Sequence, residues 1–90
     1  MRRRAKVDLN HKEVVDAFRK AGWLVISLAK LGDGVPDLLI SRHGVMRLVE
    51  VKAAKGKLTP DQESFMKQGW HFDVIRDVSD VLFLTRALTQ

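Results

Sequence analysis

The sequence predicts a single α/β domain with a central mixed β-sheet flanked by helices, in the element order α-β-β-β-α-β-α. Three observations predict this class. Apolar residues recur at helical spacing early in the chain, short β-rich runs follow them, and a capped helical segment separates the last β-rich run from the others. The chain has 90 residues, 46% of them hydrophobic and 30% charged, which is enough for one folded core and too little for two.

The first helix and strand follow from a cap pattern and a change of periodicity. Asn10 and Glu13 have the spacing of a helix-capping pair, and the apolar residues after them predict a helix over residues 9–21. Residues 23–29 are apolar and β-rich, and the glycine-rich stretch after them predicts a turn. The arginine-rich residues 1–7 then form a basic arm in front of a domain over residues 8–90.

The next two strands form a predicted hairpin. Residues 37–41 and 45–51 are both β-rich, and His43-Gly44 between them can adopt the positive φ angles of a tight turn. With a two-residue loop, Asp37 pairs directly with Glu50 and shares one sheet face with it. Lys52 lies two residues beyond Glu50, on the same face.

The remaining elements depend mainly on caps. Thr59, Pro60 and Gln62 are suited to the N-cap, N1 and N3 positions of a helix over residues 60–68. Residues 70–76 alternate enough for a fourth strand, and Ser79 is suited to cap a final helix.

Charge and composition restrict the class of partner. The net charge is +5, and residues 1–57 carry thirteen Lys or Arg against six Asp or Glu, which suggests a polyanionic partner, although a purely solubilising charge explains the composition equally well. The chain has no cysteine, so a thiolate metal site is excluded and a reducing, cytoplasmic location is expected. Neither a signal-peptide pattern nor a long apolar run is present, so secretion and membrane insertion are not expected.

The paired carboxylates are the strongest chemical feature of the sequence. Two carboxylates opposite each other on a hairpin repel unless a cation compensates them, and either a divalent metal or Lys52 can do so. Mg²⁺ favours carboxylate oxygen and keeps water ligands, which leaves room for a phosphate and a nucleophile. Taken alone, the residues also fit a surface cluster of charges at strand ends.

The motif context favours the catalytic interpretation. Gly34-x-Pro36-Asp37, then twelve residues, then Glu50-Val51-Lys52, resembles the PD-(D/E)xK nuclease signature. The chain length, the Gly-x-Pro-Asp segment and residues 58–62 are most similar to the VRR-NUC branch, and they also resemble Holliday junction resolvases. The resemblance extends over roughly residues 8–75 and implies a restriction-endonuclease-like core.

The resemblance also implies roles for individual residues. Asp37 and Glu50 would bind Mg²⁺ or Mn²⁺, with the backbone carbonyl of Val51 as a third oxygen, and Lys52 would orient water or stabilise developing charge. Glu13 matches a first-helix glutamate that adds to the metal ligands, although a capping role explains it equally simply. Gln62 matches a catalytic glutamine of related nucleases, and its N3 position gives it an alternative capping role.

Other candidate residues are basic, aromatic or histidine. We expect phosphate contacts from the basic arm and from loop lysines. The histidines, His11, His43 and His71, lack metal-ligand spacing, so surface or turn roles are expected. Both Trp23 and Trp70 begin predicted strands, which favours core packing over stacking on bases. The predicted nucleic-acid-binding residues are Arg2, Arg3, Arg4, Lys6, Lys30, Lys55 and Lys57.

The function expected from these features is metal-dependent, structure-selective cleavage of DNA, with branched DNA such as four-way junctions as the substrate. The products would carry 5′-phosphate and 3′-hydroxyl ends. The alternatives are a noncatalytic nucleic-acid-binding module on the same fold, or a nuclease for duplex DNA or RNA. We also expect a homodimer, and apolar residues of the last helix are candidates for its surface: Leu82, Phe83 and Leu84.

Overall fold

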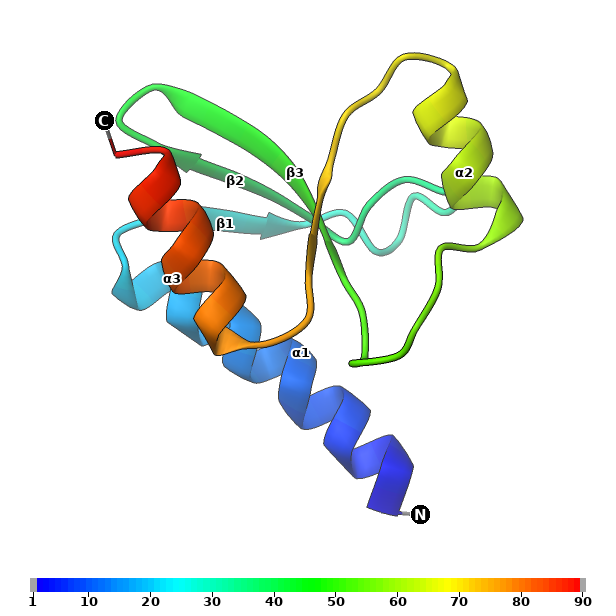
Figure 1. Ribbon diagram of the computed structural model, residues 1–90, viewed down its shortest axis with the longest axis horizontal. Helices are drawn as coiled ribbons and strands as arrows, with labels where there is room; N and C mark the ends of the chain where they lie inside the picture. Colours follow the sequence, from blue (N-terminus) through cyan, green and yellow to red (C-terminus); the bar gives the residue numbers. More distant parts are fainter. Residues whose placement is uncertain (1, 90) are drawn as a thin grey trace.

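The computed structural model describes residues 2–89, with side chains described from Asn10 onward. It confirms the expected element order of alternating helices and strands around one mixed sheet (Figure 1). The elements are α1 (Arg2–Lys20), β1 (Leu24–Ser27), β2 (Leu38–Arg42), β3 (Val45–Val51), α2 (Pro60–Lys67), β4 (Asp73–Ile75) and α3 (Val78–Ala87).

The sheet has the strand order β1-β2-β3-β4, in which the first three strands are antiparallel and β4 runs parallel to β3. The hairpin register is the predicted one, because Leu38 pairs with Val49 and Arg42 pairs with Val45. His43 and Gly44 have φ angles of 51° and 82°, as expected for a two-residue turn with positive φ at both positions. The expected hairpin is therefore confirmed.

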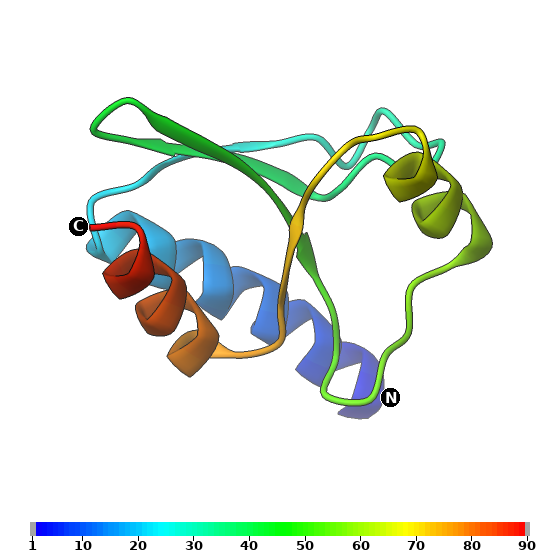
Figure 2. The same cartoon turned by 45° about the horizontal axis from the view of Figure 1, so that its top comes forward.

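The core lies between one face of the sheet and the helices α1 and α3. Figure 2 shows both helices on the same side of the sheet, with α2 beyond the open end of the hairpin, away from the turn. Every second residue along the strands points into this core and packs against the apolar face of α1. The most deeply buried members are Val14, Phe18, Leu38, Ile40, Val49 and Val81.

The first helix begins earlier than the cap pattern indicated. The backbone is helical from Arg2, so Asn10 lies inside α1 and the predicted Asn10–Glu13 cap is wrong. Residues 2–9 contain neither glycine nor proline, and arginine, alanine, lysine and leucine favour helix, so nothing in this segment stops it. The predicted arm is thus continuous with α1, and the side chains of Arg2, Arg3, Arg4 and Lys6 lie outside the described ones.

Two further expectations in the last third of the chain are wrong. Asp77, and not Ser79, is the N-cap of α3, because its carboxylate accepts a hydrogen bond from the Asp80 amide. Trp70 is 54% exposed and stacks on Phe65 of α2, whereas Trp23 is buried as expected. The strand after Trp70 begins only at Asp73, so the tryptophan lies in the connecting segment and outside the core.

Helices α2 and α3 otherwise agree with their predicted positions. Thr59 is the N-cap of α2 and Pro60 its first residue, which confirms the predicted start of this helix. Within residues 2–89, no helix has the combination of length and apolar character that crossing a membrane requires.

Candidate active site

The site is built at the open end of the β2–β3 hairpin, where the register continues to place Asp37 opposite Glu50. Asp37 precedes β2 by one residue, and its Oδ2 accepts a hydrogen bond of 2.9 Å from the Val51 amide. The backbone of Leu28 in turn donates to the Asp37 carbonyl at 2.7 Å. Asp37 is therefore held to β3 and to the chain after β1, which fixes its carboxylate beside Glu50.

Glu50 is the electrostatic centre of the site. Its side chain is buried, with Oε2 accepting a hydrogen bond from Gln62 Nε2 at 2.8 Å and lying 3.6 Å from Lys52 Nζ. Burial raises the pKa of Glu50, and the nearby Asp37 carboxylate raises it further, while Lys52 and Gln62 act in the opposite direction. Its other oxygen, Oε1, is buried without any hydrogen-bond partner among the described residues.

Gln62 has the capping role that the sequence predicted, and it also contacts the Glu50 carboxylate. The Gln62 side-chain oxygen accepts a hydrogen bond from the Thr59 backbone amide at 3.0 Å. The Gln62 backbone amide donates to Thr59 Oγ1 at 3.2 Å, so the two residues form a capping box. The Gln62 side-chain nitrogen donates to Glu50. Because one Gln serves both contacts, the start of α2 and the position of the Glu50 carboxylate depend on each other.

Gly34 explains why a glycine stands in the segment that leads into Asp37. Its φ angle is +80°, and a Cβ on it would collide with the backbone carbonyl of Asp61 at the start of α2. Figure 1 shows the β1–β2 connection beside α2. A side chain at this position would push apart the two segments that carry Asp37 and Gln62.

Arg76 positions the loop that follows Lys52, and the sequence analysis did not identify it. Its guanidinium Nη1 donates to the carbonyls of Ala53, Ala54 and Gly56 at 2.7, 3.3 and 2.8 Å. The Lys52 amide also donates to the Ile75 carbonyl at 3.0 Å, beside Arg76. These acceptors lie 20 to 23 positions away in sequence, so no local pattern could have revealed the contact.

The remaining predicted site residues do not join this cluster. Glu13 is exposed on α1, and among the described side chains no group of three His, Cys, Asp or Glu residues converges, so no third such side chain joins Asp37 and Glu50. Lys30, Lys55 and Lys57 are exposed in loops, where they are free to approach a polyanion. Asp37, Glu50, Lys52 and Gln62 are thus the predicted residues that the fold brings together.

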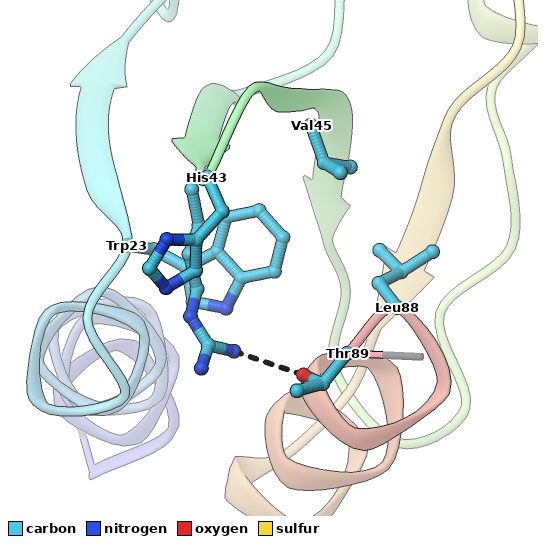
Figure 3. A pocket seen from close by; sticks show the side chains of 6 residues that line it. Trp23, His43, Val45, Leu88 and Thr89 are labelled. Carbon is cyan, nitrogen blue, oxygen red and sulfur yellow. Dashed lines mark hydrogen bonds between the residues drawn. The ribbon is translucent and has the colours of Figure 1, made fainter.

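A hollow of about 270 Å³ lies at the opposite, turn end of the hairpin (Figure 3). Arg42 lies over the Trp23 ring, 5.9 Å from its centroid, and donates to Thr89 Oγ1 at 3.1 Å. Five residue pairs separate this end from Asp37 and Glu50, or roughly 17 Å along the strands. The hollow is therefore separate from the carboxylates.

The donor set at the open end fits a hard divalent cation. Two carboxylates lie on one face, one buried carboxylate oxygen lacks a partner, and no soft sulfur or histidine ligand is expected there. An unpartnered buried carboxylate oxygen is costly, because desolvation is not offset by a hydrogen bond. A bound cation would supply the missing partner.

Comparison with known proteins identifies the family. A model of the VRR-NUC domain matches residues 3–77. The chain belongs to the VRR-NUC family. A solved structure described as a VRR_NUC domain agrees with this one at a TM-score of 0.68 and 31% sequence identity, covering 92% of this chain and 97% of that one. No protein of curated function matches the chain.

Membership confirms the resemblance that the motifs indicated. The VRR-NUC family is a branch of the PD-(D/E)xK superfamily, so this chain is a nuclease domain with the restriction-endonuclease-like fold. In this VRR-NUC domain the two motif carboxylates and the motif lysine come from the hairpin, and α2 supplies the glutamine.

Proposed function

We propose that this VRR-NUC domain is an Mg²⁺- or Mn²⁺-dependent endodeoxyribonuclease that hydrolyses phosphodiester bonds in branched DNA, leaving 5′-phosphate and 3′-hydroxyl ends. The observation that carries the proposal is the buried Glu50 Oε1, which has no hydrogen-bond partner among the described side chains although Asp37, Lys52 and Gln62 surround the same carboxylate. A buried carboxylate oxygen without a hydrogen bond is costly, and a bound cation is a partner that would offset this cost.

Asp37 and Glu50 would hold the metal ion, with the carbonyl of Val51 as a third oxygen donor. When bound, the ion would polarise the scissile phosphate and lower the pKa of a water ligand. Asp37 is already oriented by the Val51 amide, and Glu50 by Gln62. These hydrogen bonds fix the two carboxylates before any ligand arrives, which is the usual role of the groups behind metal ligands.

Lys52 would act on the phosphate and on the attacking water. Its ammonium is half-buried and lies 3.6 Å from Glu50 Oε2, so it stays near the carboxylates instead of extending into solvent. A fixed positive charge in a partly desolvated site stabilises negative charge that develops on phosphate oxygens. The backbone bond of Lys52 to Ile75 and the Arg76-bound loop hold its position.

We separately propose that Glu13 contributes to metal binding once substrate is present. It is exposed and lies on the helix that packs beneath the sheet. Replacing Glu13 by Gln would raise the metal concentration needed for half-maximal cleavage if it contributes a ligand, and would leave that concentration unchanged if it does not.

DNA contacts would come from basic residues around the site. Lys30, Lys55 and Lys57 lie in exposed loops, and the two latter belong to the segment between Lys52 and α2. We also assign phosphate contacts to Arg2, Arg3, Arg4 and Lys6. Each lost phosphate contact lowers the slope of log binding constant against log salt by about one unit. A binding series for the protein lacking residues 2–6 tests the contribution of this segment.

A homodimer would supply two identical centres for paired cuts across a junction. The chain carries one PD-(D/E)xK motif, and resolution of a four-way junction requires two symmetric incisions. A supercoiled cruciform plasmid distinguishes the outcomes, because paired cuts within one binding event yield linear DNA and independent cuts accumulate nicked circles first.

The proposed function is tested by a cleavage panel with Mg²⁺ or Mn²⁺ on four-way junction, flap, duplex, single-stranded DNA and RNA. We expect the branched substrates to be cut fastest, and both EDTA and Asp37→Asn to abolish cutting. Preference for RNA or plain duplex would replace the substrate proposal. Tight DNA binding without cleavage of any substrate would indicate a noncatalytic binding module.

A further inference from the structure

The outward face of the sheet is apolar where an exposed sheet is normally polar. Residues that alternate away from the α1–α3 core on β1, β2 and β3 should face water and be hydrophilic if nothing covers them. Instead, five of the six positions between the turn and the carboxylates are apolar. These outward positions are Leu24, Ile26, Leu39, Ser41, Met46 and Leu48.

Three of these side chains are exposed in the single chain, whereas Leu39, Ser41 and Leu48 are half-buried. Leu24, Ile26 and Met46 are 74%, 56% and 60% exposed, and Trp70 beside them is 54% exposed. A hollow of about 420 Å³ on this surface is lined by Leu39, Met46 and Leu48 from the sheet and by Trp70 and His71. Figure 2 shows that α1 and α3 lie across the sheet from this face, and no described helix covers this outer face at the turn half of the hairpin.

We propose that this outer sheet face, defined as Leu24, Ile26, Leu39, Met46, Leu48 and Trp70, is the surface on which a second copy of the chain packs. The inference rests on the homodimer proposed above and names its interface. It replaces the last helix as the expected surface.

The size of the patch fits a dimer. A large apolar residue has a surface of roughly 200 Å². The exposed fractions of Leu24, Ile26, Met46 and Trp70 then correspond to about 500 Å² of exposed surface in total. A stable interface buries about 800 Å² on each partner, and its apolar centre is surrounded by a polar rim. The outer sheet face therefore supplies most of what one subunit needs, and neighbouring polar residues would complete it.

The charge of the patch favours a second copy over nucleic acid. The six residues are uncharged, and the Arg47 that borders the hollow is already bonded to Asp73 by two hydrogen bonds of 3.0 and 3.1 Å. Surfaces that bind DNA are strongly positive. A two-fold interface places the same patch on both partners, so an uncharged patch avoids repulsion between like charges.

The last helix is a weaker candidate. Leu84 packs against the core, so the candidates left on this helix are Leu82 and Phe83, which are 53% and 77% exposed. The core-facing side of α3 is already buried through Val81. Its exposed residues are therefore a small group on a helix that has a packed face, whereas the outer face of the sheet is covered by no described helix at the turn end of the hairpin.

The proposed interface would also place the two catalytic centres. Met46, Leu48 and Glu50 alternate along β3 on one face, with about 7 Å between successive members. Packing across Met46 and Leu48 would set both Glu50 clusters at the borders of one interface, at a fixed separation.

The test is sedimentation equilibrium at micromolar concentration, with EDTA present and DNA absent, so that it does not depend on nuclease activity. The variants are Met46→Glu and Leu24→Glu on the sheet and Phe83→Glu on α3 as the matched control, since all three positions are exposed. We expect a wild-type mass of twice 10.2 kDa. Each sheet variant should weaken dimerisation roughly 30-fold or more, with Phe83→Glu unchanged.

The opposite pattern overturns the proposal. A wild-type monomer, or a dimer lost in Phe83→Glu and kept in both sheet variants, assigns the outer sheet face no role in pairing. A monomer whose DNA affinity falls in both sheet variants would make the face a surface for nucleobases. Circular dichroism melting of each variant checks that folding survives, and the cleavage panel of the wild type separately tests the nuclease proposal.

Discussion

The two ends of the β2–β3 hairpin differ in how their charged groups are compensated. At the turn end, Arg42 lies over Trp23 and donates to Thr89, so its charge rests on an aromatic face and a hydroxyl (Figure 3). At the open end, the buried Glu50 faces a second carboxylate, and its Oε1 has no partner among the described residues.

This difference supports the proposal that the open end binds a ligand. A cation on an aromatic face with a hydrogen bond is stabilising by itself. Two carboxylates beside each other in a desolvated site are destabilising until a cation binds. The hollow at the turn end is well formed, yet unsatisfied electrostatics, and not the presence of a hollow, distinguishes the site in this molecule.

The largest contrast between the two ends should appear in catalysis. Asp37→Asn or Glu50→Gln should lower kcat/KM about a thousand-fold or more, equivalent to about 4 kcal/mol, because each removes a charge from the metal-binding pair. Arg42→Met at the turn end should change it less than about three-fold. Steady-state cleavage of a labelled junction measures both, and a comparable loss in Arg42→Met would erase the proposed distinction.

A smaller effect is expected from Gln62, which connects α2 to the open end. Gln62→Leu should lower cleavage roughly 10- to 100-fold, as loss of a group behind a metal ligand commonly does. Thr59→Ala is the matched control, since it removes the cap hydroxyl, costs about 1 kcal/mol of stability and keeps the amide of Gln62. Equal activity losses in the two variants would mean that Gln62 acts solely through the cap.

The turn end should instead be sensitive in stability. Trp23 Nε1 donates to Thr85 Oγ1 at 2.8 Å, and Arg42 lies over the same ring. Trp23→Phe should therefore lower the free energy of unfolding by about 1–2 kcal/mol, through the lost hydrogen bond and reduced packing. Urea unfolding measures this loss. An unchanged midpoint would show that the contacts at this end contribute nothing.

The smallest effect is a pH dependence of stability at the open end in chelated protein. Because the pKa of Glu50 is raised above its ordinary 4.5, the stability linked to its protonation is fully present below that value and is lost as pH rises through the folded pKa. Glu50→Gln lacks this loss, so the Tm of this variant should exceed that of the wild type by an amount that grows from pH 4 to pH 7.

Excess Mn²⁺ extends this comparison. It should raise the Tm of the wild type at pH 7 and leave that of Glu50→Gln nearly unchanged, because binding to the folded state stabilises it. A difference in Tm that does not change with pH, or equal stabilisation of the two proteins by Mn²⁺, would contradict the assignment of Glu50 as the buried carboxylate that binds the metal.

The sequence by itself determined the features that depend on near neighbours. The His43-Gly44 turn fixes the hairpin register, and the register places Asp37 against Glu50 without reference to the rest of the fold. The Thr59–Gln62 capping box is likewise local. In each case the interacting groups are a few residues apart or connected by one tight turn, so backbone geometry restricts them to one arrangement.

The tertiary structure decided what depends on packing between distant segments. The contact of Gln62 with Glu50, the hold of Arg76 on the loop after Lys52 and the exposure of the outer sheet face have no local pattern. The cap spacing of Asn10 and Glu13 predicted a later start of α1 than the structure has. Residues 2–9 favour helix, and their propensity outweighs the cap pattern. Such features depend on which surfaces meet once the strands pair, and alternation of apolar and polar residues does not specify that when both faces of a strand are apolar.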